Sequence, residues 1–216
     1  MTKYIRFLII MGMSIQGFTQ NIERDIFHNL KHESANGSYT SYLEKNIFND
    51  LIFSDNRGNE ITLEKKYIAI EYGDVLKNAE AEIAIFKSMI HEHRRDKDYK
   101  AKFSVDIFNK IIIEDNRNRK VEIGKDIKGN ETYKEENNGV HRSMQTRFNG
   151  VIEYKGENKE ATLQKDIFNK WIYKDSHGNE FKFSKKTWDK LKNKFGTEEN
   201  IFNHLIFEFL ELLKKK

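Results

Sequence analysis

Apolar and polar positions alternate along this chain in short runs that recur in one form. An Asp-Ile-Phe-Asn or Asn-Ile-Phe-Asn stretch is followed by four β-forming residues and a polar turn, at 46–60, 106–120 and 166–180. A looser copy starts at Asp25. Short β-forming runs bounded by Asn, Asp and Gly are typical of strands joined by tight turns. Each unit is therefore predicted to be a strand–turn–strand hairpin.

The spacing of these units is regular. The phenylalanine of the Ile-Phe pair falls at Phe27, Phe48, Phe108 and Phe168. Two degenerate copies, with Lys128 and Phe148 at the marker position, fill the gap and give a period of 20 from residue 108 onward. A fixed period of this length is the signature of stacked supersecondary units. Consecutive hairpins are expected to form one antiparallel meander.

The turn positions carry residues that tolerate a positive φ. Asparagine follows the marker at Asn49, Asn109 and Asn169, and Asn149-Gly150 fills the same place in the degenerate copy. In the second turn of each unit, the glycine of two copies is replaced by Asn118 in the third. Asparagine is the commonest non-glycine residue in the left-handed region. The exchange therefore indicates a backbone requirement at that position.

Two segments change from strand to helical periodicity. Between residues 73 and 95, apolar residues recur every three or four positions, which predicts a helix with one apolar face. Asp74 or Asn78 is expected to cap it. Its predicted face consists of Leu76, Ala79, Ile83, Phe86 and Ile90.

The end of the chain repeats this plan. Ser184 is expected to cap a helix over 185–195 with Trp188 and Leu191 inward, and Thr197 a last helix to about residue 213. That last helix is apolar around most of its circumference, so it must be covered. The helix could be covered by its own sheet, by a partner protein or by a second copy of the chain. Phe202 and Phe209 are therefore candidate contact residues, with self-association through this helix as one outcome.

The predicted fold class is α+β, with antiparallel β-hairpin repeats of about 20 residues and a few covering α-helices. The organisation by repeats is a signal peptide over 1–19, two hairpins and a helix over 20–97, and four hairpins and two helices over 98–216. Residues 129–142 form the weakest repeat and are expected to be a loose excursion or an edge hairpin.

The first residues predict export. Lys3 and Arg6 precede a short apolar run, and Gly17 and Thr19 stand at the −3 and −1 positions of a cleavage site near Gln20. Without residues 1–19 the chain has 36 Lys and Arg against 34 Asp and Glu, and these charges are interleaved. No nucleic-acid partner and no transmembrane span in the mature chain are expected. The expected location is the periplasm or the outside of the cell.

The sequence offers little catalytic chemistry. It has no cysteine, which excludes disulfides, thiol catalysis and cysteine-bound zinc. The Asp-x-x-Gly-Asn turns place Arg57, Arg117 and His177 where a calcium loop needs oxygen ligands. His91 and His93 are two residues apart, so on a helix they point in different directions. No metal and no cofactor are expected, and the catalytic residues of any activity are unknown.

Aromatic residues give one further hint. A stripe on one face of the meander is predicted from Tyr154, Trp171 and Tyr173. The unit length and the Trp-Ile-Tyr…Gly-Asn pattern resemble cell-wall-binding hairpin repeats in period and shape. Those repeats use several aromatics per unit to hold a ligand cation, and here only Trp171 stands at that position. The stripe is a candidate partner-binding surface, with core packing as the alternative.

These observations predict an exported, non-enzymatic protein that binds or acts as a scaffold in the cell envelope or outside the cell. Its partner would be a protein or an envelope glycan. The alternative is a secreted or periplasmic hydrolase whose carboxylates are assembled from separate repeats. A third possibility is a structural surface component that associates through its last helix.

Overall fold

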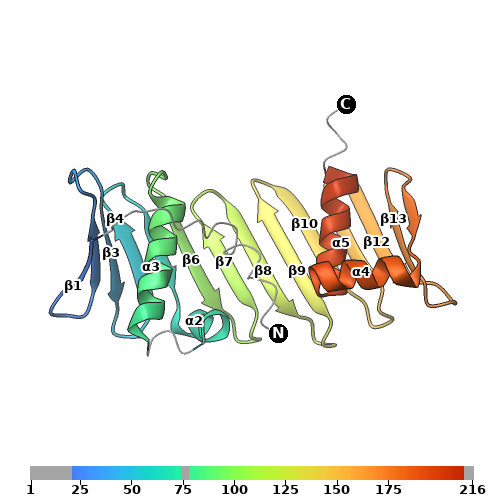
Figure 1. The fold of residues 1–216 in the computed structure, drawn as a ribbon, viewed down its shortest axis with the longest axis horizontal. Helices are drawn as coiled ribbons and strands as arrows, with labels where there is room; N and C mark the ends of the chain where they lie inside the picture. Colours follow the sequence, from blue (N-terminus) through green and yellow to red (C-terminus); the bar gives the residue numbers. More distant parts are fainter. Residues whose placement is uncertain (1–20, 74–77, 212–216) are drawn as a thin grey trace. The chain divides into compact units, whose positions relative to one another are not determined.

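The structure is a computed structural model that describes residues 21–73 and 78–211. In this part of the chain, fourteen strands are ordered as they follow in the sequence, β1 to β14 (Figure 1). The fold is α+β with hairpin repeats, as predicted. The chain divides into two compact units, one ending at Lys120 and one beginning at Val121. The predicted signal peptide and the positions Asp74, Leu76 and Leu213 lie outside the described residues.

The described residues of the first unit form seven strands and two helices. In chain order they are β1 (Asn21–Arg24), β2 (Leu30–Glu33), β3 (Thr40–Lys45), β4 (Leu51–Asp55), β5 (Glu60–Leu63), α2 (Lys65–Glu71), α3 (Ala79–His93), β6 (Lys100–Val105) and β7 (Ile111–Asp115). Strands β1 to β5 pair antiparallel with their neighbours, and β6 pairs antiparallel with β7. Of these elements, the short helix α2 was not predicted.

One pair of strands breaks the expected meander. β5 and β6 are parallel, with Glu60 opposite Lys100 and Leu63 opposite Phe103. Parallel neighbours need a crossover, because the chain must return to the end where the first strand began. Helices α2 and α3 make this return. The parallel pair also explains why β6 and β7 belong to the first unit, although grouping by repeats ended its first block at residue 97.

Helix α3 covers one face of the sheet in the first unit (Figure 1). It buries Ile85, Phe86, Met89 and Ile90, and Phe86 meets Phe53 of β4 edge-on at 6.1 Å. Of the face predicted for this helix, Phe86 and Ile90 are buried and Ile83 is half-buried, whereas Ala79 is exposed. Asn78, one of the two predicted caps, accepts from the backbone N–H groups of Glu80 and Ala81.

The buried face of α3 also includes a carboxylate. Glu82 is buried, with Arg24 Nη2 at 2.7 Å and Lys45 Nζ at 2.8 Å from its two oxygens. Arg24 and Lys45 are the last residues of β1 and β3. A buried charge is tolerated only when it is paired, and these two cations join the start of α3 to two strand ends.

The end of α3 is fixed by another buried polar group, Asn59. Its side-chain amide donates to the Asp55 carboxylate and to the carbonyls of His93 and Asp96, and its oxygen accepts from Tyr99 N–H at 2.9 Å. Asn59 thereby joins the β4–β5 turn, the end of α3 and the start of β6.

The second unit contains the remaining elements. They are β8 (Arg119–Lys125), which crosses the boundary, β9 (Glu131–Asn137), β10 (Val140–Thr146), β11 (Ile152–Gly156), β12 (Lys159–Lys165), β13 (Trp171–Asp175), β14 (Glu180–Lys182), α4 (Lys185–Phe195), α5 (Glu198–Leu205) and the π-helical segment η2 (Ile206–Glu211). Strands β9 to β14 each pair antiparallel with their neighbours in this series.

Helices α4 and α5 cover the sheet of the second unit (Figure 1). The bounds of α4 agree with the prediction, and both predicted caps are made: Ser184 accepts from Thr187 N–H, and Thr197 accepts from Asn200 N–H. Trp188 stacks on Trp171 of β13 with ring centroids 4.6 Å apart. The apolar residues of α5 and most of those of η2 pack into this core, so the sheet itself covers the last helix.

Two expectations about the degenerate repeats were wrong. Residues 129–142 are not loose, because β9 and β10 pair over six residue pairs and β10 pairs on with β11. The period also slips there. The turn before β11 starts at Arg147, since Gly150 N–H donates to Arg147 O. The corresponding turns start at Asp126 and Asp166, so the steps are 21 and 19 residues. Phe148 therefore occupies the position of isoleucine in the other copies.

We expect Asn59→Ala to lower the free energy of unfolding of the first unit by about 2 kcal/mol or more, because it leaves several buried groups without partners. Asn179→Ala is the matched control, since Asn179 occupies the same turn position and its side chain donates to Asp175. We expect a loss of about 0.5 kcal/mol there. Urea unfolding followed by circular dichroism measures both. Equal losses would contradict the role given to Asn59.

Candidate interaction surface

One turn geometry recurs at both ends of the strands. In the turn at 106–110, Asp106 Oδ1 accepts from Phe108 N–H and Lys110 N–H, both at 2.8 Å, and Asn109 N–H donates to Asp106 O. Asn109 has a φ of 58°. This is a type I turn followed by a left-handed residue, a common hairpin connection. The first residue is Asp or Asn, and the same oxygen pattern closes the turns that start at Asp25, Asn46, Asp55, Asp115, Asp126, Asp166 and Asp175.

The second and third residues of these turns differ between the two ends of the strands. At one end of the first unit they are Ile-Phe in every turn. We call these side chains the apolar tips and their end the apolar end: Ile26, Phe27, Ile47, Phe48, Ile107 and Phe108. In the second unit the apolar tips are Ile127, Phe148, Ile167 and Phe168. All ten are between 69% and 100% exposed.

At the other end, the same turn positions hold polar residues that bond within the protein. Asn116 donates to Asp98 O and accepts from Lys100 N–H, which ties its turn to the neighbouring segment. Arg117 lies over the Tyr99 ring at 4.6 Å. Asn56 makes the corresponding contacts to Ser38 and Thr40. This end is called the polar end.

The turn itself does not require isoleucine or phenylalanine, since type I turns accept most residues at these positions. Neighbouring hairpins of a sheet lie about 10 Å apart, because each contributes two strands. The first unit therefore presents its Ile-Phe pairs in a row along the apolar end. Repeated exposed apolar residues are typical of interaction sites, and nothing in the fold accounts for them.

A charged and aromatic cluster occupies the polar end of the first unit. His93 Nδ1 lies 3.0 Å from Asp96 Oδ2, and Arg117 Nη2 lies 2.9 Å from Asp96 Oδ1. Burial alone would raise the pKa of Asp96, but hydrogen bonds from Arg117 and His93 hold it below its ordinary value. Burial, with the Asp115 carboxylate, raises the pKa of Tyr99 to about 12. Tyr99 Oη donates to that carboxylate at 3.3 Å. The cluster connects α3 to the β7–β8 turn.

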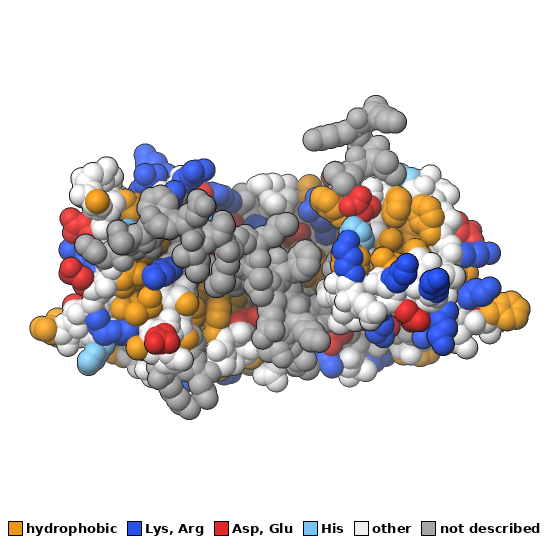
Figure 2. All heavy atoms as spheres, viewed as in Figure 1, with side chains coloured by type: hydrophobic (Ala, Val, Ile, Leu, Met, Phe, Trp, Pro, Cys, Tyr) orange, Lys and Arg blue, Asp and Glu red, His pale blue; other side chains and the backbone are white. Residues whose placement is uncertain are grey.

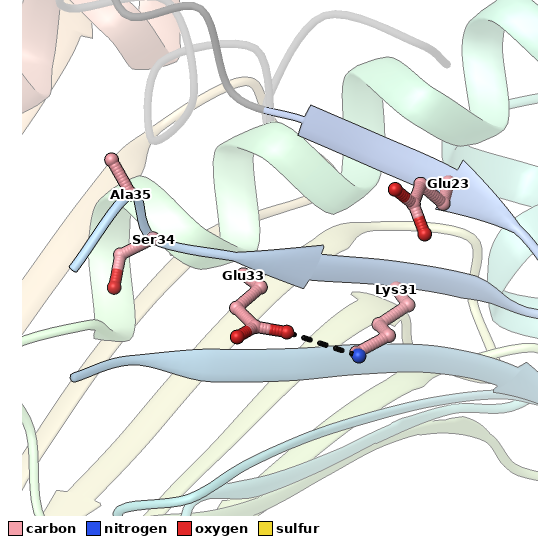
Figure 3. Close-up of a pocket in the computed structure, with 5 residues that line it drawn as sticks. All are labelled: Glu23, Lys31, Glu33, Ser34 and Ala35. Atoms are coloured by element: carbon pink, nitrogen blue, oxygen red, sulfur yellow. Dashed lines mark ion pairs between the residues drawn. The ribbon is translucent and has the colours of Figure 1, made fainter. Parts of the chain in front are cut away.

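A small recess of about 270 Å³ lies against β1 and β2 (Figure 3). Glu23, Lys31, Glu33, Ser34 and Ala35 line it, and Lys31 Nζ pairs with Glu33 at 3.1 Å. Hydrolysis by two carboxyl groups needs one with a raised pKa. Burial raises the pKa of Glu71, but Glu71 does not line the recess. The described residues also contain no cluster of three or more His, Asp and Glu that could hold a metal ion.

The five residues predicted as a partner surface lie in or against the core of the second unit. Tyr154, Trp171, Tyr173 and Phe202 are buried, and Phe209 is partly buried against them. Tyr154 and Tyr173 face Ala161 and Leu163 of β12 across the strands. Their positions are those of packing residues, and partner binding through them stays a prediction. Phe207, on the same helical segment as Phe209, is 56% exposed.

The fold and this surface define a β-hairpin-repeat protein whose covering helices leave a row of turn residues exposed in each unit. Comparisons with protein-family models, curated proteins and solved structures found no match. Among the described residues, no helix is both long and apolar enough to cross a membrane.

Sequence reasoning used the Ile-Phe pairs only as a marker of the repeat and missed them as a candidate site. The signal was present, because an apolar pair inside a turn is unusual where loops are otherwise polar. The contrast with Asn56-Arg57 in the same repeat was also readable.

We expect the double substitution Ile107→Ser, Phe108→Ser to change the free energy of unfolding by less than about 0.5 kcal/mol, because exposed side chains contribute little to stability. Ile111→Ser, on the adjoining strand and 7% exposed, should cost about 3 kcal/mol. Urea unfolding compares the two. A large loss for the double variant would show that the tips serve the fold.

The lowered pKa of Asp96 predicts a dependence of stability on pH. A carboxyl group with a lowered folded-state pKa stabilises the fold above its unfolded value of about 4 and loses that contribution as the pH falls below it. We expect Asp96→Asn to reduce stability at pH 7 more than at pH 3, as measured by urea unfolding at both values. Asp189→Asn, on the exposed side of α4, is the matched control. An equal effect of Asp96→Asn at both values would contradict the assignment.

Proposed function

We propose that this chain is a non-enzymatic binding or scaffold protein that acts in the periplasm or outside the cell and contacts its partner through the apolar tips. The proposal rests on the difference in turn residues between the apolar end and the polar end of the strands. The same turn holds exposed Ile-Phe at one end and internally bonded polar residues at the other.

The exposure of the tips has an energetic consequence. An isoleucine or phenylalanine side chain gains roughly 1.5–3 kcal/mol on full burial. The tips forgo this gain in the free protein, and a partner that covers them would recover it. A short row of such residues therefore supplies enough apolar area for specific contact without an enclosed pocket.

Export is supported by the N-terminal pattern of Lys3, Arg6 and a short apolar run. No second function is favoured by a particular observation, because the recess near Lys31 pairs its charges internally.

The test is affinity capture of the tagged protein from the envelope and medium of its host, with mass analysis of captured proteins, glycans and lipids. Three forms are compared: the unchanged protein, Ile47→Ser with Phe48→Ser, and Asn56→Ser with Arg57→Ser. The two altered turns flank the same strand, β4, and differ in the end they occupy. We expect a stoichiometric partner with the first and third forms and its loss with the second.

A clean monomer with no captured component would contradict the proposal, as would a partner retained equally by all three forms. A measurement of mass in solution accompanies the capture. If the unchanged protein is a dimer and the tip variant a monomer, the partner is a second copy of the chain.

A further inference from the structure

The second unit combines its apolar tips with a basic helix. Helix α4 carries five lysines and one aspartate in eleven residues. Trp188 is buried against the sheet, and Leu191 and Phe195 pack beside it. Lys186, Lys190 and Lys194 are exposed and spaced four residues apart, which places them on the face opposite Trp188. Figure 2 shows basic side chains gathered over this helix.

This helix lies at the apolar end of the second unit. β14 runs antiparallel to β13, with Lys182 opposite Ile172, so the chain reaches the start of β13 where α4 begins. Phe183 N–H donates to Trp171 O, and Trp188 stacks on Trp171. Trp171 directly follows the turn that carries Ile167 and Phe168. Trp171 thus links the inner face of α4 to the turn that carries Ile167 and Phe168, and the lysines lie on the outer face of the same helix.

Basic residues also flank the tips themselves. Lys165 and Lys170 bracket the turn of Ile167 and Phe168, Arg147 precedes Phe148, and Lys128 follows Ile127. All four basic side chains are exposed. The carboxylates of these turns, at Asp126 and Asp166, are directed to backbone N–H groups of the turn.

The tips are highly exposed projections at separate turns. Ile127 is fully exposed, and the side chains of Phe148 and Ile167 are 87% and 90% exposed. A partner protein with an apolar groove binds a continuous apolar strip. A lipid bilayer, in contrast, accepts single apolar side chains below its headgroups, while its anionic headgroups bind cations. Apolar tips next to a lysine stripe therefore match the second kind of partner.

We propose that the apolar end of the second unit binds the surface of a lipid bilayer that contains anionic lipids. Ile167 and Phe168, with Ile127 and Phe148, enter the interface, and Lys186, Lys190 and Lys194 contact the headgroup phosphates. The proposal rests on the proposed function, of which it names the partner class.

The test is co-sedimentation of the full-length protein, as purified, with vesicles of phosphatidylcholine alone and with vesicles containing about one third phosphatidylglycerol. We expect partition onto the anionic vesicles and at least about tenfold less onto the neutral ones. Raising the salt concentration should weaken the binding, because it screens the lysine contribution.

Three variants locate the surface. Ile167→Ser with Phe168→Ser should weaken binding about tenfold or more. Replacing Lys186, Lys190 and Lys194 by glutamine should also weaken it about tenfold. The matched control replaces Lys155, Lys159 and Lys174, at the polar end of the same unit, by glutamine. This control removes the same charge and should bind like the unchanged protein. Circular dichroism confirms that each variant is folded.

Each outcome decides the proposal. No partition onto anionic vesicles overturns it, as does equal partition of the tip variant and the unchanged protein, or equal loss with the control. If vesicles fail while host capture yields a protein partner that depends on the tips, the lipid inference is wrong and the binding function stands. If neither measurement depends on the tips, both are wrong.

Discussion

A single side-chain oxygen that accepts two backbone N–H groups closes each regular turn, and the rest of the structure depends on it. In the turn at 166–170, Asp166 Oδ1 accepts from Phe168 N–H and Lys170 N–H at 2.8 Å. The turn fixes which residues of the flanking strands face each other. Trp171 therefore lies opposite Lys165, and Tyr173 opposite Leu163 in the core. A shift by one residue would turn these core residues to the other face.

This interaction also separates what the fold requires from what it leaves free. In the turns that start with Asp or Asn, the first residue offers this oxygen, whereas the turn that starts at Arg147 closes without it. The fourth residue has a positive φ, as Asn49, Gly58 and Asn118 show. The second and third positions carry no such requirement, and they differ most between the ends of the strands. At the polar end they connect neighbouring segments. At the apolar end they are largely exposed, and the proposed binding role rests on this difference.

Sequence periodicity predicted strands such as β5 and the helix α4 because local turn and capping residues determine them. It did not predict α2, and it could not reveal the parallel pairing of β5 with β6, which depends on long-range contacts made by Asn59. The face of α3 was predicted only in part, because Glu82 appears polar in sequence but is buried, paired with Arg24 and Lys45. The change of repeat spacing at Arg147 was not predicted, because Phe148 is a phenylalanine at the expected marker position. The Ile-Phe pairs of the candidate site were visible in the sequence but were interpreted only as a marker of the repeat. Their exposure is a property of the folded turn and could not be predicted from the sequence.

The same turn chemistry makes the apolar tips suited to a medium poor in water. Entry of a loop into such a medium is costly when its backbone N–H groups lose their water partners. In the turn of Ile167 and Phe168, the N–H groups of Phe168, Asn169 and Lys170 all donate within the turn. Three of the backbone donors of this turn, that of Phe168 among them, are therefore already bonded. Because the turn is fixed in the free protein, little conformational entropy is lost when the tips are covered. A flexible apolar loop would have neither advantage.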